Sequence, residues 1–211
     1  MKQIASHRRD GMFTRYRRYG LAGLLSLALN TAISRLLFPG TRLLRRPFYI
    51  RGKRWICFGP NFTCGRGLRL DAFGNSSTKG ALIYIGSDVE VNDNVHIGAT
   101  ESIRIGDRVL IASMVFITDH SHGSYGRDGI HSNPRIAPGE RPLMAAPVVI
   151  EDDVWLGEFV SVLPGVRIGK GSIIGTMSTV TRDIPPYSIA VGSPARVIKQ
   201  FNFTTETWEP V

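Results

Sequence analysis

The sequence is poor in cysteine, in aromatic residues and in acidic residues relative to basic ones. Its 211 residues contain two cysteines, Cys57 and Cys64, too few for a disulfide framework, and neither lies in the Cys/His spacing of a zinc site. We therefore expect reduced thiols in a cytosolic protein, and no resident metal. Aromatic residues make up 9% of the chain and form no stacking platform along the basic segments, which argues against nucleic-acid binding.

The sequence also lacks an uninterrupted apolar run of membrane-spanning length. Polar residues, Asn30 and Arg35 among them, interrupt the apolar segment that begins at Leu21. The segment falls short of the roughly 20 apolar residues that a spanning helix needs, and no small-residue cleavage site of a signal peptide follows it. We expect a helix over residues 21–38 that ends before Pro39 and packs on the body or lies in a membrane interface.

The chain carries an excess of positive charge that is unevenly spread. Its formal net charge is +9. Much of the excess lies before residue 55, in Arg8, Arg9, Arg15, Arg17, Arg18, Arg35, Arg42, Arg45, Arg46, Arg51, Lys53 and Arg54. Such a patch can meet anionic lipid, nucleic acid or a phosphorylated substrate, and composition alone does not choose among them.

A six-residue repeat dominates the second half of the sequence. An aliphatic residue recurs at every sixth position from Ile150 to Val180, and a second series runs two positions earlier from Val148 to Ser178. The same period appears upstream in two runs, Ile85, Val91, Ile97 and then Ile105, Ile111, Ile117. Between these two runs the spacing increases by two residues, which predicts a small corner bulge.

A period of six fits neither an amphipathic helix nor a long alternating strand. It fits a short strand plus a turn, and three such units make one triangular coil. Because one coil cannot bury its own apolar face, neighbouring coils must stack into a solenoid. We predict an all-β solenoid over residues 51–200, a basic helical extension over residues 1–50 and a C-terminal tail over residues 201–211. A polar loop at about residues 118–147 breaks the repeat, and loops of this length are usually functional.

The repeats and the C-terminal end of the solenoid resemble one known family, the hexapeptide-repeat acyltransferases. The resemblance is carried by Ile85-Gly-Ser-Asp-Val-Glu-Val-Asn-Asp-Asn-Val-His-Ile-Gly98, by Ile150-Glu-Asp-Asp-Val-Trp-Leu-Gly157 and by Asp183-Ile-Pro-Pro-Tyr-Ser-Ile-Ala-Val-Gly-Ser-Pro-Ala-Arg196-Val-Ile-Lys199. The similar members are sugar O-acetyltransferases, including the O-antigen and exopolysaccharide type. The resemblance covers roughly residues 55–200 and implies a left-handed parallel β-helix that assembles as a homotrimer, whereas the periodicity itself does not show handedness.

Transfer of an acetyl group from a thioester to an alcohol requires a base, stabilisation of the oxyanion and alignment of both substrates. Histidine is the natural base near neutral pH. His120 and His122 lie in Thr118-Asp-His-Ser-His-Gly123, at the loop entry where the family places its catalytic histidine. An ungapped alignment from Ile111 favours His122, and a loop entry shortened by two residues gives His120. The family's Gly-His-Pro is absent, so both remain candidates.

The other candidate residues for the acceptor end are less distinctive. Asn92 matches an acceptor-binding asparagine of the family, with a turn-forming asparagine as the alternative. Asp119 is a candidate to orient a neighbouring histidine, as in a catalytic triad. We expect His96, on a regular coil, to be structural and His131, in the loop, to be exposed to solvent.

The resemblance implies a coenzyme A groove between neighbouring subunits, along the later coils. The matching positions are Trp155, Gly157, Thr176, Thr181, Arg182, Arg196 and Lys199. Cations clustered at the last coil can bind phosphate oxygens through charge-assisted hydrogen bonds. Glu158 stands where the galactoside acetyltransferase has serine, which weakens that contact.

We therefore expect an acetyl-CoA-dependent O-acetyltransferase for a saccharide hydroxyl, in O-antigen, capsule or exopolysaccharide biosynthesis. A cytoplasmic homotrimer is expected, and a lipid-linked saccharide is one candidate acceptor. The basic helix either contacts the inner face of the membrane or caps the solenoid. Three alternatives stay open: N-acylation of an amino sugar, a non-catalytic scaffold, and a zinc-dependent solenoid trimer whose ligands come from His96, His120 and His122.

Overall fold

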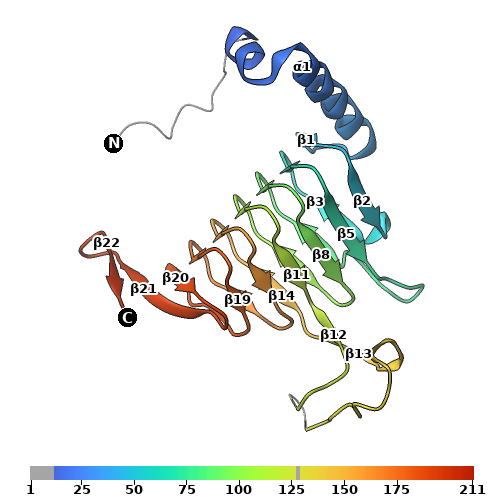
Figure 1. Ribbon diagram of the computed structural model, residues 1–211, viewed down its shortest axis with the longest axis vertical. Helices are drawn as coiled ribbons and strands as arrows, with labels where there is room; N and C mark the ends of the chain where they lie inside the picture. Colours follow the sequence, from blue (N-terminus) through green and yellow to red (C-terminus); the bar gives the residue numbers. More distant parts are fainter. Residues whose placement is uncertain (1–11, 127–128) are drawn as a thin grey trace.

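The computed structural model describes residues 12–126 and 129–211, so that His7, Arg8 and Arg9 lie outside the described part. The described residues form one helix, a triangular coil of short strands, a hairpin that projects from one corner, and an antiparallel end (Figure 1). The helix α1 lies at the start of the coil, and the last strands lie at its far end. This arrangement is a left-handed parallel β-helix with an N-terminal helical extension.

Each side of the triangle is a sheet whose successive strands come from successive coils. Sheet A contains β1 (Leu43–Leu44), β4 (Thr63–Cys64), β7 (Glu90–Val91), β10 (Leu110–Ile111), β15 (Trp155–Leu156), β18 (Ile173–Ile174), β20 (Ser188–Val191), β21 (Arg196–Asn202) and β22 (Thr207–Pro210). Sheet B contains β2 (Phe48–Arg51), β5 (Leu68–Ala72), β8 (His96–Ala99), β11 (Phe116–Thr118), β16 (Ser161–Val162) and β19 (Thr179–Val180). Sheet C contains β3 (Ile56–Phe58), β6 (Ile83–Ile85), β9 (Ile103–Ile105), β14 (Val148–Ile150) and β17 (Arg167–Ile168). The pairing is parallel throughout these sheets except between β20 and β21 and between β21 and β22, where it is antiparallel.

The six-residue ladder fills the shaft of the coil, as the sequence predicts. The ladder positions are buried: Ile85, Val91, Ile97, Ile105, Ile111, Ile117, Ile150, Leu156, Val162, Ile168, Ile174 and Val180. The second series, from Val148 to Ser178, is buried as well. Ile97 is aligned with Leu70 on one neighbouring strand and with Ile117 on the other, so each coil covers the apolar face of the next.

The extra residues between the two upstream runs form a turn at one corner. This turn, residues 100–102, directs its backbone N–H groups toward the start of the projecting segment. The segment leaves the coil after Thr118 and rejoins it at Val148, which pairs with Ile103 of the coil before. Its two ends are tied together because the N–H of Ala146 donates to the carbonyl of Asp119 (2.8 Å). The insertion therefore leaves the stacking of the coils intact.

Within the insertion, two short strands form a hairpin. β12 (His120–His122) pairs antiparallel with β13 (Leu143–Ala145), and a short 3-10 turn (Pro138–Glu140) precedes β13. A second 3-10 turn, Lys53–Trp55, joins β2 to β3 in the first coil. The hairpin projects beyond the end of β11 (Figure 1).

Helix α1 (Met12–Leu37) begins before the predicted start and ends, as predicted, before Pro39. Its Asn30 and Ser34 face the first coil, where the Ser34 hydroxyl accepts the N–H of Leu44 (2.7 Å) and Asn30 Oδ1 accepts the Nε–H of Arg46 (3.1 Å). The helix therefore caps the solenoid through polar contacts. The residues 16–37 are long and apolar enough to cross a membrane, and only 11% of this stretch is buried.

Candidate functional site

The corner where the projecting segment leaves sheet B brings a histidine and a carboxylate together. His120 Nδ1 lies 2.9 Å from Asp119 Oδ1 and 3.2 Å from the Thr118 hydroxyl. A proton on Nδ1 is donated to the carboxylate, and this tautomer leaves Nε2 free to accept a proton. The pair therefore has the geometry of a histidine base with an orienting carboxylate.

The carboxylate of Asp119 is completely buried and is fixed by backbone donors. It accepts the N–H groups of Thr100 (2.9 Å), Glu101 (2.8 Å) and Ser102 (2.8 Å). These donors belong to the corner turn that the two additional residues create. These backbone hydrogen bonds hold the Asp119 carboxylate in place.

The imidazole of His120 is mostly enclosed, with 16% of its side chain exposed. The Phe73 ring packs against it in a T-shaped arrangement, with ring centroids 5.8 Å apart. Gly98 is a second neighbour, where a Cβ atom would stand 3.6 Å from His120 Cε1. These contacts enclose most of the ring.

His122, which the ungapped alignment favours, lies two residues further along the hairpin. It is exposed on β12, where it pairs with Leu143, and its backbone carbonyl accepts the hydroxyl of Tyr125 (2.6 Å). His131 is exposed in the same insertion. Of the loop histidines, His120 is the one that the structure joins to Asp119.

A second histidine–carboxylate pair lies on the neighbouring coils. His96 Nε2 is 3.1 Å from Asp71 Oδ2, and a Cβ atom on Gly98 would stand 3.7 Å from the same nitrogen. Burial lowers the pKa of His96 below its usual value. His96 and His120 therefore flank Gly98 from two sides. The sequence does not reveal Asp71 as a partner of His96, because the two residues lie on neighbouring coils. The irregular spacing before Ile83 hides how these coils align.

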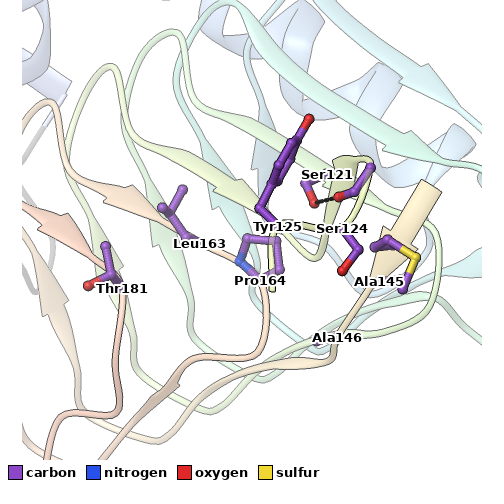
Figure 2. A pocket seen from close by; sticks show the side chains of 10 residues that line it. Ser121, Ser124, Tyr125, Ala145, Ala146, Leu163, Pro164 and Thr181 are labelled. Carbon is purple, nitrogen blue, oxygen red and sulfur yellow. Dashed lines mark hydrogen bonds between the residues drawn. The ribbon is translucent and has the colours of Figure 1, made fainter. Parts of the chain in front are cut away.

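A pocket of about 350 Å³ lies between the hairpin and the later coils. Its walls are Ser121, Gly123, Ser124, Tyr125, Met144, Ala145, Ala146, Leu163, Pro164 and Thr181. Figure 2 shows Leu163, Pro164 and Thr181 contributed by the coil opposite Ser121, Ser124 and Tyr125 of the insertion. Ser121 follows His120 on β12 and Ala145 pairs with His120 in the hairpin, so two neighbours of the candidate base line the pocket, whereas His120 itself does not.

Of the residues matched to coenzyme A contacts, Thr181 lines this pocket. Trp155, Gly157 and Thr176 lie instead at the corner between sheets A and B, away from the hairpin's corner. A side chain at Gly157 would stand 2.8 Å from the Thr176 backbone nitrogen, so this glycine permits close stacking of two coils. One chain therefore does not gather these positions into one site.

The remaining predicted residues lie on the outside of the coil. Arg182 follows Thr181 and is exposed, and Arg196 and Lys199 are exposed on β21. Asn92 is exposed in the turn after β7, and no described contact brings it to His120. Within residues 12–126 and 129–211, no three His, Cys, Asp or Glu side chains gather as a metal site would require.

Comparison with known proteins decides the family. Over 193 residues the chain is 46% identical to WbbJ of Escherichia coli (strain K12), which is named as a lipopolysaccharide biosynthesis O-acetyl transferase. The match covers 92% of this chain and 96% of WbbJ, and residues 147–182 match the family described as bacterial transferase hexapeptide (six repeats). The chain belongs to the hexapeptide-repeat transferase family. The predicted membership, and with it the assignment as an acyltransferase, is confirmed.

Two further comparisons concern a sugar acetyltransferase and the fold. The galactoside O-acetyltransferase of Escherichia coli (strain K12) is 39% identical over 123 residues, which is 58% of this chain and 56% of that one. Among solved structures, AntD, an N-acyltransferase from Bacillus cereus in complex with dTDP and 3-hydroxybutyryl-CoA, superposes with a TM-score of 0.66. It covers 85% of this chain and 92% of its own, at 19% identity, so the likeness concerns the fold.

Proposed function

We propose that the protein transfers an acetyl group from acetyl-coenzyme A to a saccharide hydroxyl during surface polysaccharide biosynthesis, as O-antigen, capsule or exopolysaccharide is made. The observation that carries the proposal is the His120–Asp119 pair, enclosed at a corner of the solenoid at the base of the hairpin that forms one wall of a pocket. The 46% identity to a named lipopolysaccharide O-acetyl transferase supports the reaction class and the saccharide acceptor.

His120 acts as the general base in this proposal. Its Nε2 accepts the proton of the sugar hydroxyl while the hydroxyl oxygen attacks the thioester carbonyl carbon. The charge of buried Asp119 stabilises the imidazolium that forms. When the tetrahedral intermediate collapses, the carbon–sulfur bond breaks, the imidazolium returns the proton to the thiolate, and the sugar ester leaves.

The pocket between the hairpin and the coils receives the thioester end of coenzyme A. Most of its lining is apolar, as in Leu163, Met144 and Tyr125, and Thr181 adds a hydroxyl. The exposed cations Arg182, Arg196 and Lys199 then bind the phosphates through charge-assisted hydrogen bonds. AntD binds 3-hydroxybutyryl-CoA, and the fold that this chain shares with AntD supports an acyl-coenzyme A donor here.

The enzyme works as a homotrimer in this proposal, because the donor positions occupy two corners of the coil. A second protomer would bring its Trp155, Gly157 and Thr176 to the pocket of the first. Exposed apolar side chains follow the outside of sheet A and its adjoining corner: Leu110, Met114, Trp155, Phe159 and Met177. An exposed apolar surface of this extent is typical of a protein–protein interface.

The proposed location is the cytoplasmic face of the inner membrane, where α1 would lie in the interface. Leu21, Leu25 and Leu29 are spaced four residues apart and point away from the solenoid, while Asn30 and Ser34 face it. The helix thus exposes its apolar side to the surroundings. Arg35, exposed in the last turn, would add attraction to anionic lipid.

Single substitutions of the loop histidines test the mechanism. His120→Asn should lower kcat with acetyl-coenzyme A and a saccharide acceptor by about 10²–10⁴-fold, the usual contribution of a positioned base. His122→Asn should retain most activity, and His131→Asn is the matched control from the same insertion. Wild-type turnover by His120→Asn, with loss of turnover in His122→Asn, would transfer the role to His122.

The product separates O-acylation from N-acylation of an amino sugar. An ester releases acetate in mild base, whereas an amide does not. Mass spectrometry of the acceptor before and after mild base treatment reports the linkage. A base-stable product would overturn the O-acetyltransferase assignment.

A further inference from the structure

The outer face of sheet B carries side chains that the mechanism above does not use. Two rows cross β2, β5, β8 and β11, and they consist of Tyr49, Arg69, His96, Phe116 and of Arg51, Asp71, Gly98, Thr118. These strands lie side by side between α1 and the corner with the hairpin (Figure 1). Adjacent strands are about 4.8 Å apart, so the rows extend about 14 Å from the first coil to the corner of His120.

The charges on this face do not cancel. The side chain of Asp71 is 1% exposed, and Arg69 Nε lies 2.6 Å from its Oδ2, while Arg51 Nε lies 3.6 Å from its Oδ1. Two guanidinium groups therefore share one carboxylate. Burial lowers the pKa of His96, which favours its neutral form, so the group keeps a net positive charge. Asp71 Oδ1 has no hydrogen-bond partner, so Arg51 forms an ion pair with this carboxylate but no hydrogen bond to it.

In the single chain, both guanidinium groups remain open to an incoming ligand. Half of each side chain is exposed, 51% for Arg51 and 50% for Arg69. The Tyr49 hydroxyl accepts one donor of Arg51 (2.9 Å), which leaves others of its five N–H groups directed outward. A guanidinium in this state can bind a carboxylate or phosphate with two parallel hydrogen bonds.

Exposed aromatic rings accompany the arginines. The guanidinium of Arg51 lies over the rings of Tyr49 (5.7 Å) and Phe73 (5.6 Å), and both rings are exposed. The guanidinium of Arg69 also lies over the Tyr49 ring, 5.7 Å from its centroid. Aromatic rings that combine an apolar surface with polar neighbours are typical of ligand-binding surfaces.

The cluster is continuous with the candidate base. Phe73 contacts both the guanidinium of Arg51 and the ring of His120. Gly98 is buried between His96 and His120, and the imidazoles of both histidines remain partly exposed at this face. A ligand that reaches His120 from this face therefore passes the arginines.

We propose that this basic-aromatic face, formed by Tyr49, Arg51, Arg69, Asp71 and Phe73, binds an anionic group of the acceptor. The sugar ring that receives the acetyl group lies over Gly98 beside His120, and a phosphate or carboxylate of the same acceptor lies on Arg51 and Arg69. This inference rests on the proposed acetyl transfer and names its acceptor class as an anionic saccharide. The distance of about 14 Å across the face accommodates an acceptor longer than one sugar ring.

Steady-state kinetics with three matched acceptors test this proposal: methyl glucoside, glucose 1-phosphate and glucuronic acid. The KM of the wild-type enzyme should be at least about tenfold lower for an anionic acceptor, the effect expected of one or more charge-assisted hydrogen bonds. Whichever of phosphate and carboxylate shows the effect identifies the anion. Arg51→Gln should raise the KM for that acceptor to the neutral value and leave kcat within about twofold.

Arg51 is the primary variant because Asp71 keeps Arg69 and His96 when Arg51 is replaced. Arg104→Gln is the matched control, since Arg104 is an exposed arginine 5.9 Å from an aromatic ring, Tyr84, on sheet C. It should change neither KM. Equal KM values for the three acceptors in the wild type, or an Arg51→Gln variant that keeps the anion preference, would overturn the proposal.

Calorimetric titration separates this inference from the acetyl-transfer proposal. In the His120→Asn variant, which retains the face but lacks the base, glucose 1-phosphate or glucuronic acid should still bind, and additional replacement of Arg51 should abolish binding. Anion binding without acetyl transfer by the wild type would contradict the proposed reaction alone. Acetyl transfer without anion binding would contradict the acceptor class alone.

Discussion

At the scale of single residues, the site is built from contacts between neighbouring coils. His120 and Asp119 are adjacent in sequence, yet the carboxylate is held by amides one coil earlier. His96 and Asp71 likewise meet across two coils. The position of each of these side chains therefore depends on the register between neighbouring coils. A substitution that shifts the backbone at the site should change activity even where it removes no functional group.

Gly98→Ala tests whether the acceptor lies between the two imidazoles. The added Cβ would meet His120 and His96 at 3.6 and 3.7 Å, which is ordinary van der Waals contact. We expect unchanged thermal stability, and a kcat/KM for the acceptor lowered by about tenfold or more, or about 1.4 kcal/mol. Steady-state kinetics and thermal unfolding measure the two quantities.

Gly139→Ala is the matched control, because nothing lies within 4 Å of a Cβ atom there. It should leave kcat/KM unchanged. Full activity in Gly98→Ala would place the acceptor elsewhere.

His96 should make the folded state less stable in acid. Because burial lowers its pKa in the folded protein, the unfolded chain binds the proton more readily as the pH falls below its usual pKa of about 6.5. Stability should therefore decrease between about pH 7 and pH 5. Among its charged or titratable neighbours, Arg69 and His120 also lower the pKa of His96, whereas Asp71 raises it.

The measurement is urea unfolding of the wild type and of His96→Gln across this pH range. The variant should lose less stability on acidification than the wild type. Parallel pH profiles would show that His96 titrates alike in both states.

Some of the site was accessible from sequence and some was not, for physical reasons. The loop entry, with Asp119 beside a histidine, follows from the end of the six-residue ladder. The choice between His120 and His122 does not, because it depends on how the chain leaves β11. The roles of Asp71, Arg51 and Arg69 depend on the register between coils, which the irregular segment before Ile83 hides.

At the scale of elements, α1 contacts the solenoid through polar side chains and exposes several apolar ones. Asn30 and Ser34 hydrogen-bond to the first coil, whereas Leu21, Leu25 and Leu29 are exposed. The sequence predicted the end of this helix at Pro39, because proline cannot continue it. The outward direction of the leucines was not predictable, since it is set by the hydrogen bonds to β1.

The leucine side of α1 should bind anionic vesicles. We expect the wild type to sediment with phosphatidylglycerol vesicles, and the Leu25→Ser/Leu29→Ser double variant to stay largely in the supernatant, because apolar burial provides most of the binding energy. Leu143→Ser is the control, since Leu143 is an exposed leucine on β13.

Binding to phosphatidylcholine vesicles should be weaker, because these lack the negative charge that attracts arginine. Equal sedimentation of the double variant would show that α1 is not the membrane contact. A change in oligomeric state of the double variant, without a change in sedimentation, would assign the leucines to another copy of the chain.

At the scale of the whole molecule, the ladder alone determines that coils stack but leaves the hand of the coil open. Parallel crossovers are right-handed in nearly all other folds, so general rules favour the wrong hand here. The handedness came from the family resemblance. The stacking, in contrast, follows from the six-residue period, because Ile97, Ile117 and their counterparts must cover one another.

The exposed apolar side chains on sheet A and its adjoining corner should hold the proposed trimer together: Leu110, Met114, Trp155, Phe159 and Met177. Light scattering coupled to size exclusion should give three times the chain mass for the wild type, and a lower mass for the Phe159→Ser/Met177→Ser double variant. Both side chains are exposed in the single chain, so the double variant should fold. Tyr84→Ser, an exposed aromatic residue on sheet C, should remain a trimer. A monomeric wild type would contradict the shared donor site.

The way the projecting segment returns to the coil has an evolutionary consequence. Val148 resumes the rung next to Ile103, and Ala146 closes the segment's base onto Asp119. The residues between these two contacts can change in number without affecting how the coils stack. Doubling the length of a flexible loop raises the free energy of loop closure by only about 0.6 kcal/mol. The insertion, which forms one wall of the proposed donor pocket, can therefore differ between relatives while the stacked coils stay the same.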